Sequence, residues 1–79
     1  NYTYSIFPVA QSQFGYDIFQ NNKLLIHQPQ IPGISGTKGF ESSEDAAKVA
    51  VLVIEKIKKG IFPPTVTPEE LKNLKIKVK

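Results

Sequence analysis

The stretch SSEDAAKVAVLVIEKIKKG, from Ser42 to Gly60, decides the fold, because no other segment carries a strong helical pattern. Ser42 stands three residues before Asp45, as in a capping box, and Gly60 suits the left-handed residue that ends a helix. A period of about 3.6 residues gathers the apolar side chains on one face, whose centre is formed by Ala46, Ala50, Val53 and Ile57. The sequence therefore predicts one long helix over 42–60 packed on a sheet. We expect Val53→Asp to unfold the domain, which a thermal melt would show.

Val51 and Leu52 do not belong to this apolar face and fall at the edges of the polar half of the helix. One interpretation is that the C-terminal residues cover them, or that they are ordinary exposed apolar residues. The other interpretation is a surface for self-association or for a partner protein. The sequence leaves both open.

The composition is that of one small domain spanning residues 1–79, of which 41% are hydrophobic. We expect this domain to consist of a β-rich part (1–41, with a hairpin at 14–28), the main helix (42–60), and a turn, short helix and tail (61–79). There is no cysteine, hence no disulfide or zinc-finger spacing, and no apolar run long enough to cross a membrane. The net charge of +3 comes from lysines without any arginine. We interpret this as a solvated surface and expect no nucleic acid partner.

Three β-prone segments precede the helix, at 2–9, 14–20 and 23–28. Asn21-Asn22 separates the last two and predicts a two-residue hairpin turn of type I′. The corresponding register pairs Tyr16 with His27, Asp17 with Ile26, Ile18 with Leu25 and Phe19 with Leu24. Phe19, Leu24 and Ile26 would then lie on the sheet face that the helix does not cover.

After the helix, Thr67-Pro68-Glu69-Glu70 has the residues of a helix start, with Thr67 as N-cap and Glu70 at the third position. A short helix through Asn73 is expected. The alternating residues 74–79 are either a fourth, edge-type strand or a frayed tail. The predicted fold is α+β: a small antiparallel sheet of three to four strands, one long helix on one face, and a short C-terminal helix.

Three pieces of the chain are specific enough to suggest a family: IHQP at 26–29, SGTKGF at 35–40 and GIFPPTVT at 60–67. Over about Phe14 to Leu71 the chain resembles the Bacteroidetes family of short uncharacterised exported proteins, domain of unknown function 4907. The resemblance implies an exported or lipid-anchored protein. We therefore expect an extracytoplasmic location, in the periplasm or on the outer cell surface, with the signal segment absent from this sequence. It implies no activity.

Two features invite a ligand-binding interpretation. His27 is the only histidine, and without cysteine or a carboxylate pair it cannot build a metal site or a catalytic triad, so a structural role is favoured. The segment GISGTKG before the main helix lacks the Walker order, although its amides and lysine could hold an anion. Glycines that simply permit tight turns are the favoured alternative. The candidate ligand residues are Gly33, Ser35, Gly36, Thr37, Lys38, Gly39 and His27.

No paired catalytic carboxylates are evident, so we expect no enzyme activity, no cofactor and no metal. The favoured hypothesis is an interaction or accessory domain that binds a protein partner or itself. Its candidate surface comprises Phe19, Leu24, Ile26, Val51 and Leu52. The alternative is a small-ligand or anion-binding module that uses the glycine-rich loop.

Overall fold

The structure is a computed structural model that describes residues 1–9, 12–32 and 38–77. Within these residues the chain has the predicted α+β fold, with three antiparallel strands in the order β1-β2-β3 and two helices. The elements are β1 (Tyr2–Val9), β2 (Gln13–Gln20), β3 (Lys23–Gln28), α1 (Ser43–Lys58) and α2 (Pro68–Asn73).

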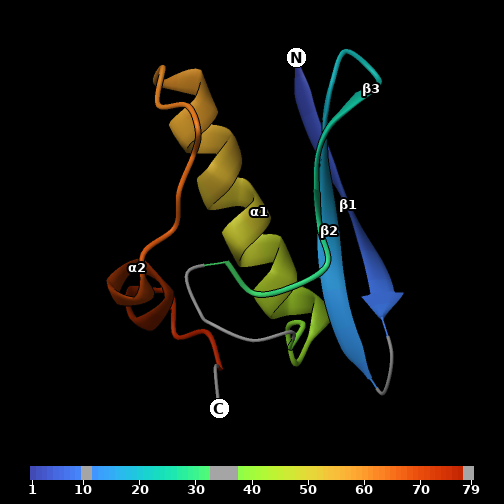
Figure 1. Cartoon of the computed structure of the whole chain (residues 1–79), viewed down its shortest axis with the longest axis vertical. Helices are drawn as coiled ribbons and strands as arrows, with labels where there is room; N and C mark the ends of the chain where they lie inside the picture. The colour runs from blue at the N-terminus through green and yellow to red at the C-terminus, as the bar shows by residue number, and fades with distance from the viewer. Residues whose placement is uncertain (10–11, 33–37, 78–79) are drawn as a thin grey trace.

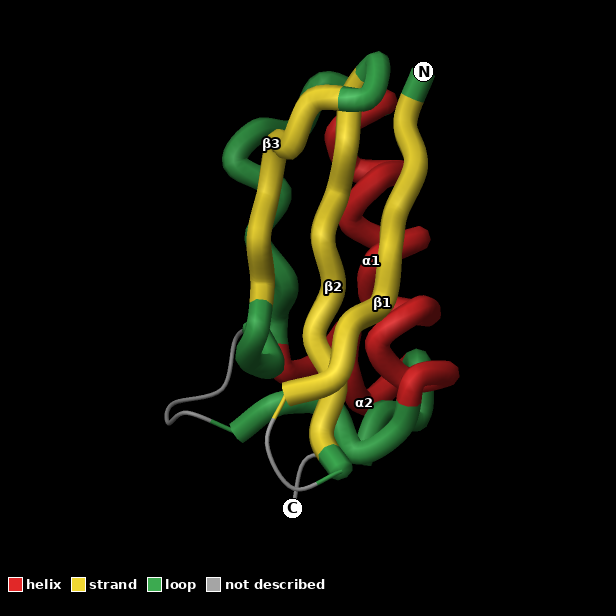
Figure 2. Tube along the Cα trace, turned by 90° about the vertical axis from the view of Figure 1, so that its right-hand side faces the viewer, coloured by secondary structure: helices red, strands yellow, loops and turns green. Residues whose placement is uncertain are grey.

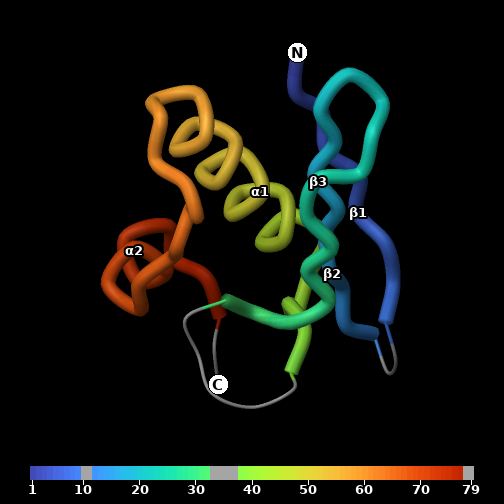
Figure 3. The backbone as a smooth tube through the Cα atoms, turned by 45° about the horizontal axis from the view of Figure 1, so that its top comes forward, coloured from blue at the N-terminus to red at the C-terminus, as the bar shows by residue number. Residues whose placement is uncertain are grey.

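The elements form three layers (Figure 1). The sheet is on one side of α1, which packs against β1 and β2, while α2 and the segment that leads to it lie on the other side. Figure 3 shows the same order from another direction, with α1 between the sheet and α2. The long helix is therefore the central layer of the molecule.

Both ends of α1 are as predicted. The Ser42 hydroxyl accepts from the Asp45 N–H at 3.1 Å. At the other end, Gly60 has a φ of 85°, its N–H donates to Ile57 O, and the Ile61 N–H donates to Lys56 O. This is the paired bonding of a Schellman motif, which satisfies carbonyls that the helix leaves without a partner.

The hairpin turn is also as predicted, but the predicted register holds for only one of the four pairs. Asn21 and Asn22 both have positive φ, as a type I′ turn requires, and Phe19 pairs with Leu24. A β-bulge follows, and Leu25 has no partner in β2. The remaining pairs are consequently shifted by one residue, to Ile18–Ile26, Asp17–His27 and Tyr16–Gln28.

The shift changes the face on which Ile26 lies. Opposite the fully buried Ile18, Ile26 packs against the core and is not on the uncovered face. The core joins the inner face of β2 to α1 and to the C-terminal segment. Its buried hydrophobic members are Tyr16, Ile18, Ile31, Phe40, Ala46, Val49, Ala50, Val53, Ile54, Val66, Leu71 and Ile76.

The C-terminal segment is neither a strand nor a frayed tail as far as Lys77. α2 begins with the predicted capping box, in which Thr67 and Glu70 bond each other's backbone N–H. It ends in a second Schellman motif, with Lys75 at a φ of 61° and the Ile76 N–H donating to Leu71 O. Ile76 is thereby buried.

Asp45 fastens this segment to the start of α1. Its carboxylate is buried and accepts from the Lys77 N–H at 3.2 Å. The start of the central layer is thus joined to the C-terminal segment by a bond that spans 32 positions of sequence.

Candidate functional site

The outer face of the sheet is partly covered by one of its own side chains. A Cβ on Gly15 would lie 2.7 Å from the Phe7 ring, so the glycine lets Phe7 of β1 lie across β2. The ring then stacks on His27 of β3, with centroids 5.0 Å apart and an interplanar angle of 10°. His27 Nδ1 is 2.5 Å from Asp17 Oδ1. This side chain is therefore held by Phe7 and Asp17, not by Tyr16 as the predicted register implied.

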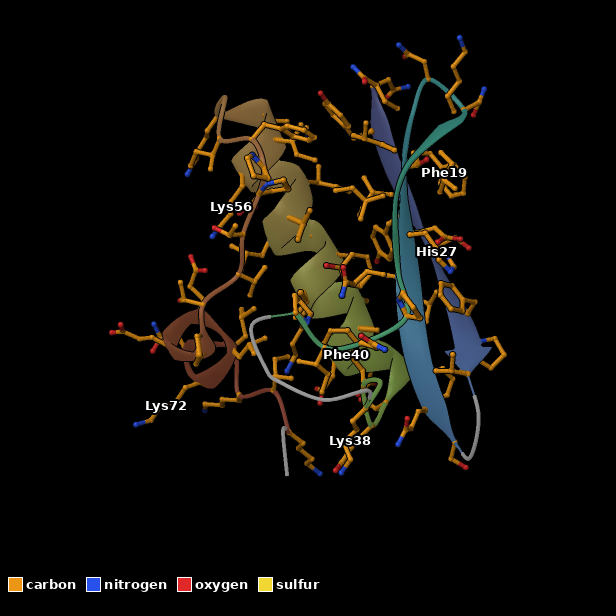
Figure 4. All side chains as sticks on the ribbon, in the orientation of Figure 1. Phe19, His27, Lys38, Phe40, Lys56 and Lys72 are labelled. Atoms are coloured by element: carbon orange, nitrogen blue, oxygen red, sulfur yellow. The ribbon has the colours of Figure 1, made fainter. Side chains whose placement is uncertain are left out.

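The predicted apolar surface does not form one patch. Phe19 and His27 lie on the outer side of the sheet (Figure 4), and Leu24 is 57% exposed, but Ile26 belongs to the core side. Leu52 is also partly buried against the core. Of the five predicted residues, Val51 lies elsewhere, on an exposed position of α1.

Of the predicted ligand residues, the structure describes His27, Lys38 and Gly39. Gly33, Ser35, Gly36 and Thr37 lie outside the described residues. The Gly39 N–H, one of the amides proposed for an anion, donates to Gln13 Oε1 at 3.0 Å. Figure 4 shows Lys38 at one end of the molecule, well separated from His27 on the sheet.

A groove that the sequence did not reveal runs between β1 and α1. It has a volume of about 530 Å³, and its lining is predominantly apolar. Tyr4 of β1 forms one wall, Val51 and Ala47 of α1 form the other, and Leu74 closes one side. Tyr4 is 41% and Val51 42% exposed, so two of the large apolar side chains on the surface meet here.

Two charged residues stand beside this apolar lining. Glu44 and Lys48 both belong to α1 and are one helical turn apart. Lys48 Nζ donates to the Leu74 carbonyl oxygen at 3.3 Å, which ties the C-terminal segment to the helix beside the groove. The groove thus combines a predominantly apolar lining with one positively and one negatively charged side chain.

The strand that borders the groove has an open edge. Phe14 and Phe40 exchange both backbone hydrogen bonds, at 2.9 and 2.8 Å, so the Phe14 backbone faces away from β1. In an antiparallel pair this direction alternates from residue to residue. Thr3, Ser5 and Phe7, opposite Phe19, Asp17 and Gly15, therefore bond to β2.

The residues between them point their backbone groups the other way. Tyr2, Tyr4 and Ile6 direct both N–H and C=O toward the open edge, and Pro8 directs only a C=O, since proline has no N–H. In the part of the chain that the structure describes, no strand pairs with this edge. Figure 2 shows β1 at the side of the sheet, with β2 between it and β3.

The side chains whose pKa is shifted lie away from the groove. Burial raises the pKa of the Tyr16 phenol. The pKa of Glu70 is lowered, chiefly by its hydrogen bond with Lys56, whose Nζ is 2.8 Å away, and also by the N-cap backbone. Both belong to the packing of the layers, and neither touches the groove.

Among residues 1–9, 12–32 and 38–77, no three His, Cys, Asp or Glu side chains come together as a group that could hold a metal ion. Within the same ranges, no helix has the length and apolar character needed to cross a bilayer.

The family comparison covers most of this architecture. A family model described as "Domain of unknown function (DUF4907)" matches residues 8–73. The chain belongs to this family. The matched region contains the α1 wall of the groove, while Tyr4 and Leu74 lie just outside it. Searches of curated proteins and of solved structures gave no match.

Proposed function

We propose that this domain is a non-catalytic interaction domain that binds an extended segment of a partner protein, or of another copy of itself, beside β1. The observation that carries the proposal is the coincidence of an open strand edge with an apolar groove. The edge offers backbone N–H and C=O groups at Tyr2, Tyr4 and Ile6, and the groove lies beside Tyr4.

Strand addition uses these two features for different purposes. Main-chain hydrogen bonds along the edge supply affinity, while pockets for alternate side chains supply selectivity. Side chains of an added strand that face α1 would lie over Val51 and Ala47. This arrangement gives Val51 a role that the helical pattern alone did not explain.

The outer face supports binding less well. Its central row is occupied by the hydrogen-bonded Asp17 and His27, and Phe7 already stacks on the imidazole. The anion-binding alternative stays a prediction, because most of its loop lies outside the described residues. The extracytoplasmic location also stays a prediction and rests on the family resemblance.

Selection of random peptides displayed on phage tests the proposal without knowledge of a natural partner. We expect the wild-type domain to enrich peptides with apolar residues at alternate positions. Val51→Lys should abolish their binding, because it places a charge in the groove. Leu24→Lys is the matched control, since it makes the same replacement at an exposed apolar residue of β3. Peptides that bind both variants equally well would refute the proposed site.

A further inference from the structure

We infer that the occupant of this site is a second copy of the same chain, paired β1 to β1 about a two-fold axis, so that two sheets join into one. The inference rests on the proposed function and names its partner. It is carried by three features of the described residues: the alternation of backbone groups along β1, the chemistry of its side chains and the charges beside the groove.

The first feature is a self-pairing register that uses every suitable edge group. When Tyr4 lies opposite Tyr4 of the other copy, Tyr2 lies opposite Ile6 in both directions. All of these residues point N–H and C=O outward, as the antiparallel ladder requires. Pro8, which has no N–H to offer, lies opposite none of these three residues. At Tyr2, Tyr4 and Ile6 the edge can therefore pair with itself without a missing bond.

The second feature is the apolar face that β1 turns toward α1. Tyr2, Tyr4 and Ile6 share this face, because side chains alternate along a strand. Tyr2 and Ile6 pack against the core of their own copy, and Tyr4 is exposed beside the groove. An added strand with apolar residues at alternate positions is the natural occupant of an edge beside an apolar groove. β1 has this pattern, and it carries no charged side chain at any of its eight positions.

The third feature is charge complementarity. A two-fold axis between the strands makes the two α1 helices run in opposite directions. Glu44 and Lys48 are one turn apart on α1, beside the groove. Opposite directions therefore offer Lys48 of each copy the Glu44 of the other. If positions 44 and 48 carried like charges, the two α1 helices would repel each other in this arrangement.

Sedimentation analysis over a range from micromolar to millimolar protein tests the inference. We expect the wild-type mass to rise toward that of a dimer as concentration increases. Val51→Lys should raise the dimer Kd by at least about tenfold, as loss of a central interface residue does. Leu24→Lys, at the other edge of the sheet, should leave the Kd unchanged.

A second pair of variants tests the backbone bonds. Tyr4→Pro removes an outward N–H without removing a bond to β2, as Pro8 already does in the native strand. Tyr4→Val also loses the ring but keeps the N–H. We expect the proline variant to dimerise at least about tenfold more weakly than the valine variant. Circular dichroism and a thermal melt establish that each variant is folded.

Three results would overturn the inference. They are a wild-type chain that stays monomeric at millimolar concentration, a dimer that Leu24→Lys weakens as much as Val51→Lys does, and equal Kd values for folded Tyr4→Pro and Tyr4→Val. None of these alone removes the proposed function. Peptides selected on the wild type that Val51→Lys fails to bind would still support strand addition by a different protein.

Discussion

The two edges of the sheet differ in length, charge and regularity. β1 has eight residues, no charged side chain and an uninterrupted register with β2. β3 has six residues, begins with Lys23 and contains the bulge at Leu25. Short strands, lysines and bulges are devices by which proteins prevent edge strands from pairing with other chains. In the part of the chain that the structure describes, β3 thus carries three of these devices, whereas most of β1 carries none and has no strand on its outer side.

Pro8 qualifies the comparison at one end of β1. It directs no N–H to the open edge, so it limits pairing to the part of the strand before it. The groove lies beside that same part, at Tyr4. The proposed strand addition would account for an edge strand that is open beside an apolar groove.

The largest effect is expected from Gly15→Ala, which disturbs the connection between the two edges. The new Cβ would approach the Gln28 carbonyl oxygen, Pro29 Cα and the Phe7 ring to 2.7 Å each. Phe7 can rotate, whereas the two backbone atoms cannot yield without moving the end of β3. We expect a loss of about 1–3 kcal/mol in the free energy of unfolding, measured by chemical denaturation.

Ser5→Ala is the control for Gly15→Ala, because Ser5 is an exposed residue of β1 on the same outer face. It should change the free energy of unfolding by less than about 0.5 kcal/mol. A Gly15→Ala variant as stable as this control would show that the close approach of Phe7 and β3 does not constrain the sheet.

The next effect distinguishes two neighbours on α1. Leu52 is partly buried against the core, so Leu52→Lys should destabilise the fold by about 1–2 kcal/mol. Val51 is exposed beside the open edge, and Val51→Lys should cost less than about 0.5 kcal/mol. Thermal melts at low protein concentration compare the two. Equal losses would mean that Val51 is needed for folding and is not reserved for a partner.

Local signals in the sequence sufficed for most of the fold. Ser42, Gly60 and Thr67 each act on backbone groups within a few residues, so their motifs were readable without knowledge of packing. Asn21-Asn22 specified the turn for the same reason. The bulge at Leu25 was not readable, because it depends on which residue of β3 enters the core opposite Ile18.

Of the residues that line the groove, only Val51 was predicted from the sequence to belong to an interaction surface. The others come from β1, from the first turns of α1 and from Leu74, which are brought together only by the packing of three layers. The outward direction of the Tyr4 backbone also depends on the register of β1 with β2, in which Tyr4 lies opposite Ile18. Alternation in residues 2–9 indicated a strand with Tyr4 on one face, but it could not show which edge would stay open.

A smaller effect is expected from Asp45→Ala, which releases the segment that closes the groove. The Lys77 N–H would lose its carboxylate partner, at a cost of about 1 kcal/mol in the free energy of unfolding. Glu44→Ala, one residue earlier but exposed, should cost less. Amide hydrogen exchange should be faster at Ile76 and Lys77 in Asp45→Ala alone. Unchanged exchange at both amides would mean that the segment is held by Ile76 and Leu71 without Asp45.

The smallest effect concerns acid and leaves both edges of the sheet intact. Glu70 has a lowered pKa in the folded state, so its contribution to stability is fully present above its ordinary pKa of about 4.5 and is lost as pH falls through the lowered value. A partly exposed pair such as Glu70 and Lys56 contributes about 0.2–1 kcal/mol. Glu70→Gln should therefore narrow the difference in stability between neutral and acidic pH, whereas Glu69→Gln, at an exposed neighbour, should not. If Glu70→Gln kept the full acid sensitivity, the bond of Glu70 with Lys56 of α1 would contribute nothing measurable to the free energy of unfolding. If Glu70→Gln also weakened dimer formation, the groove beside β1 would depend on the bond between α1 and α2. The open edge of β1 would then not act independently of α2.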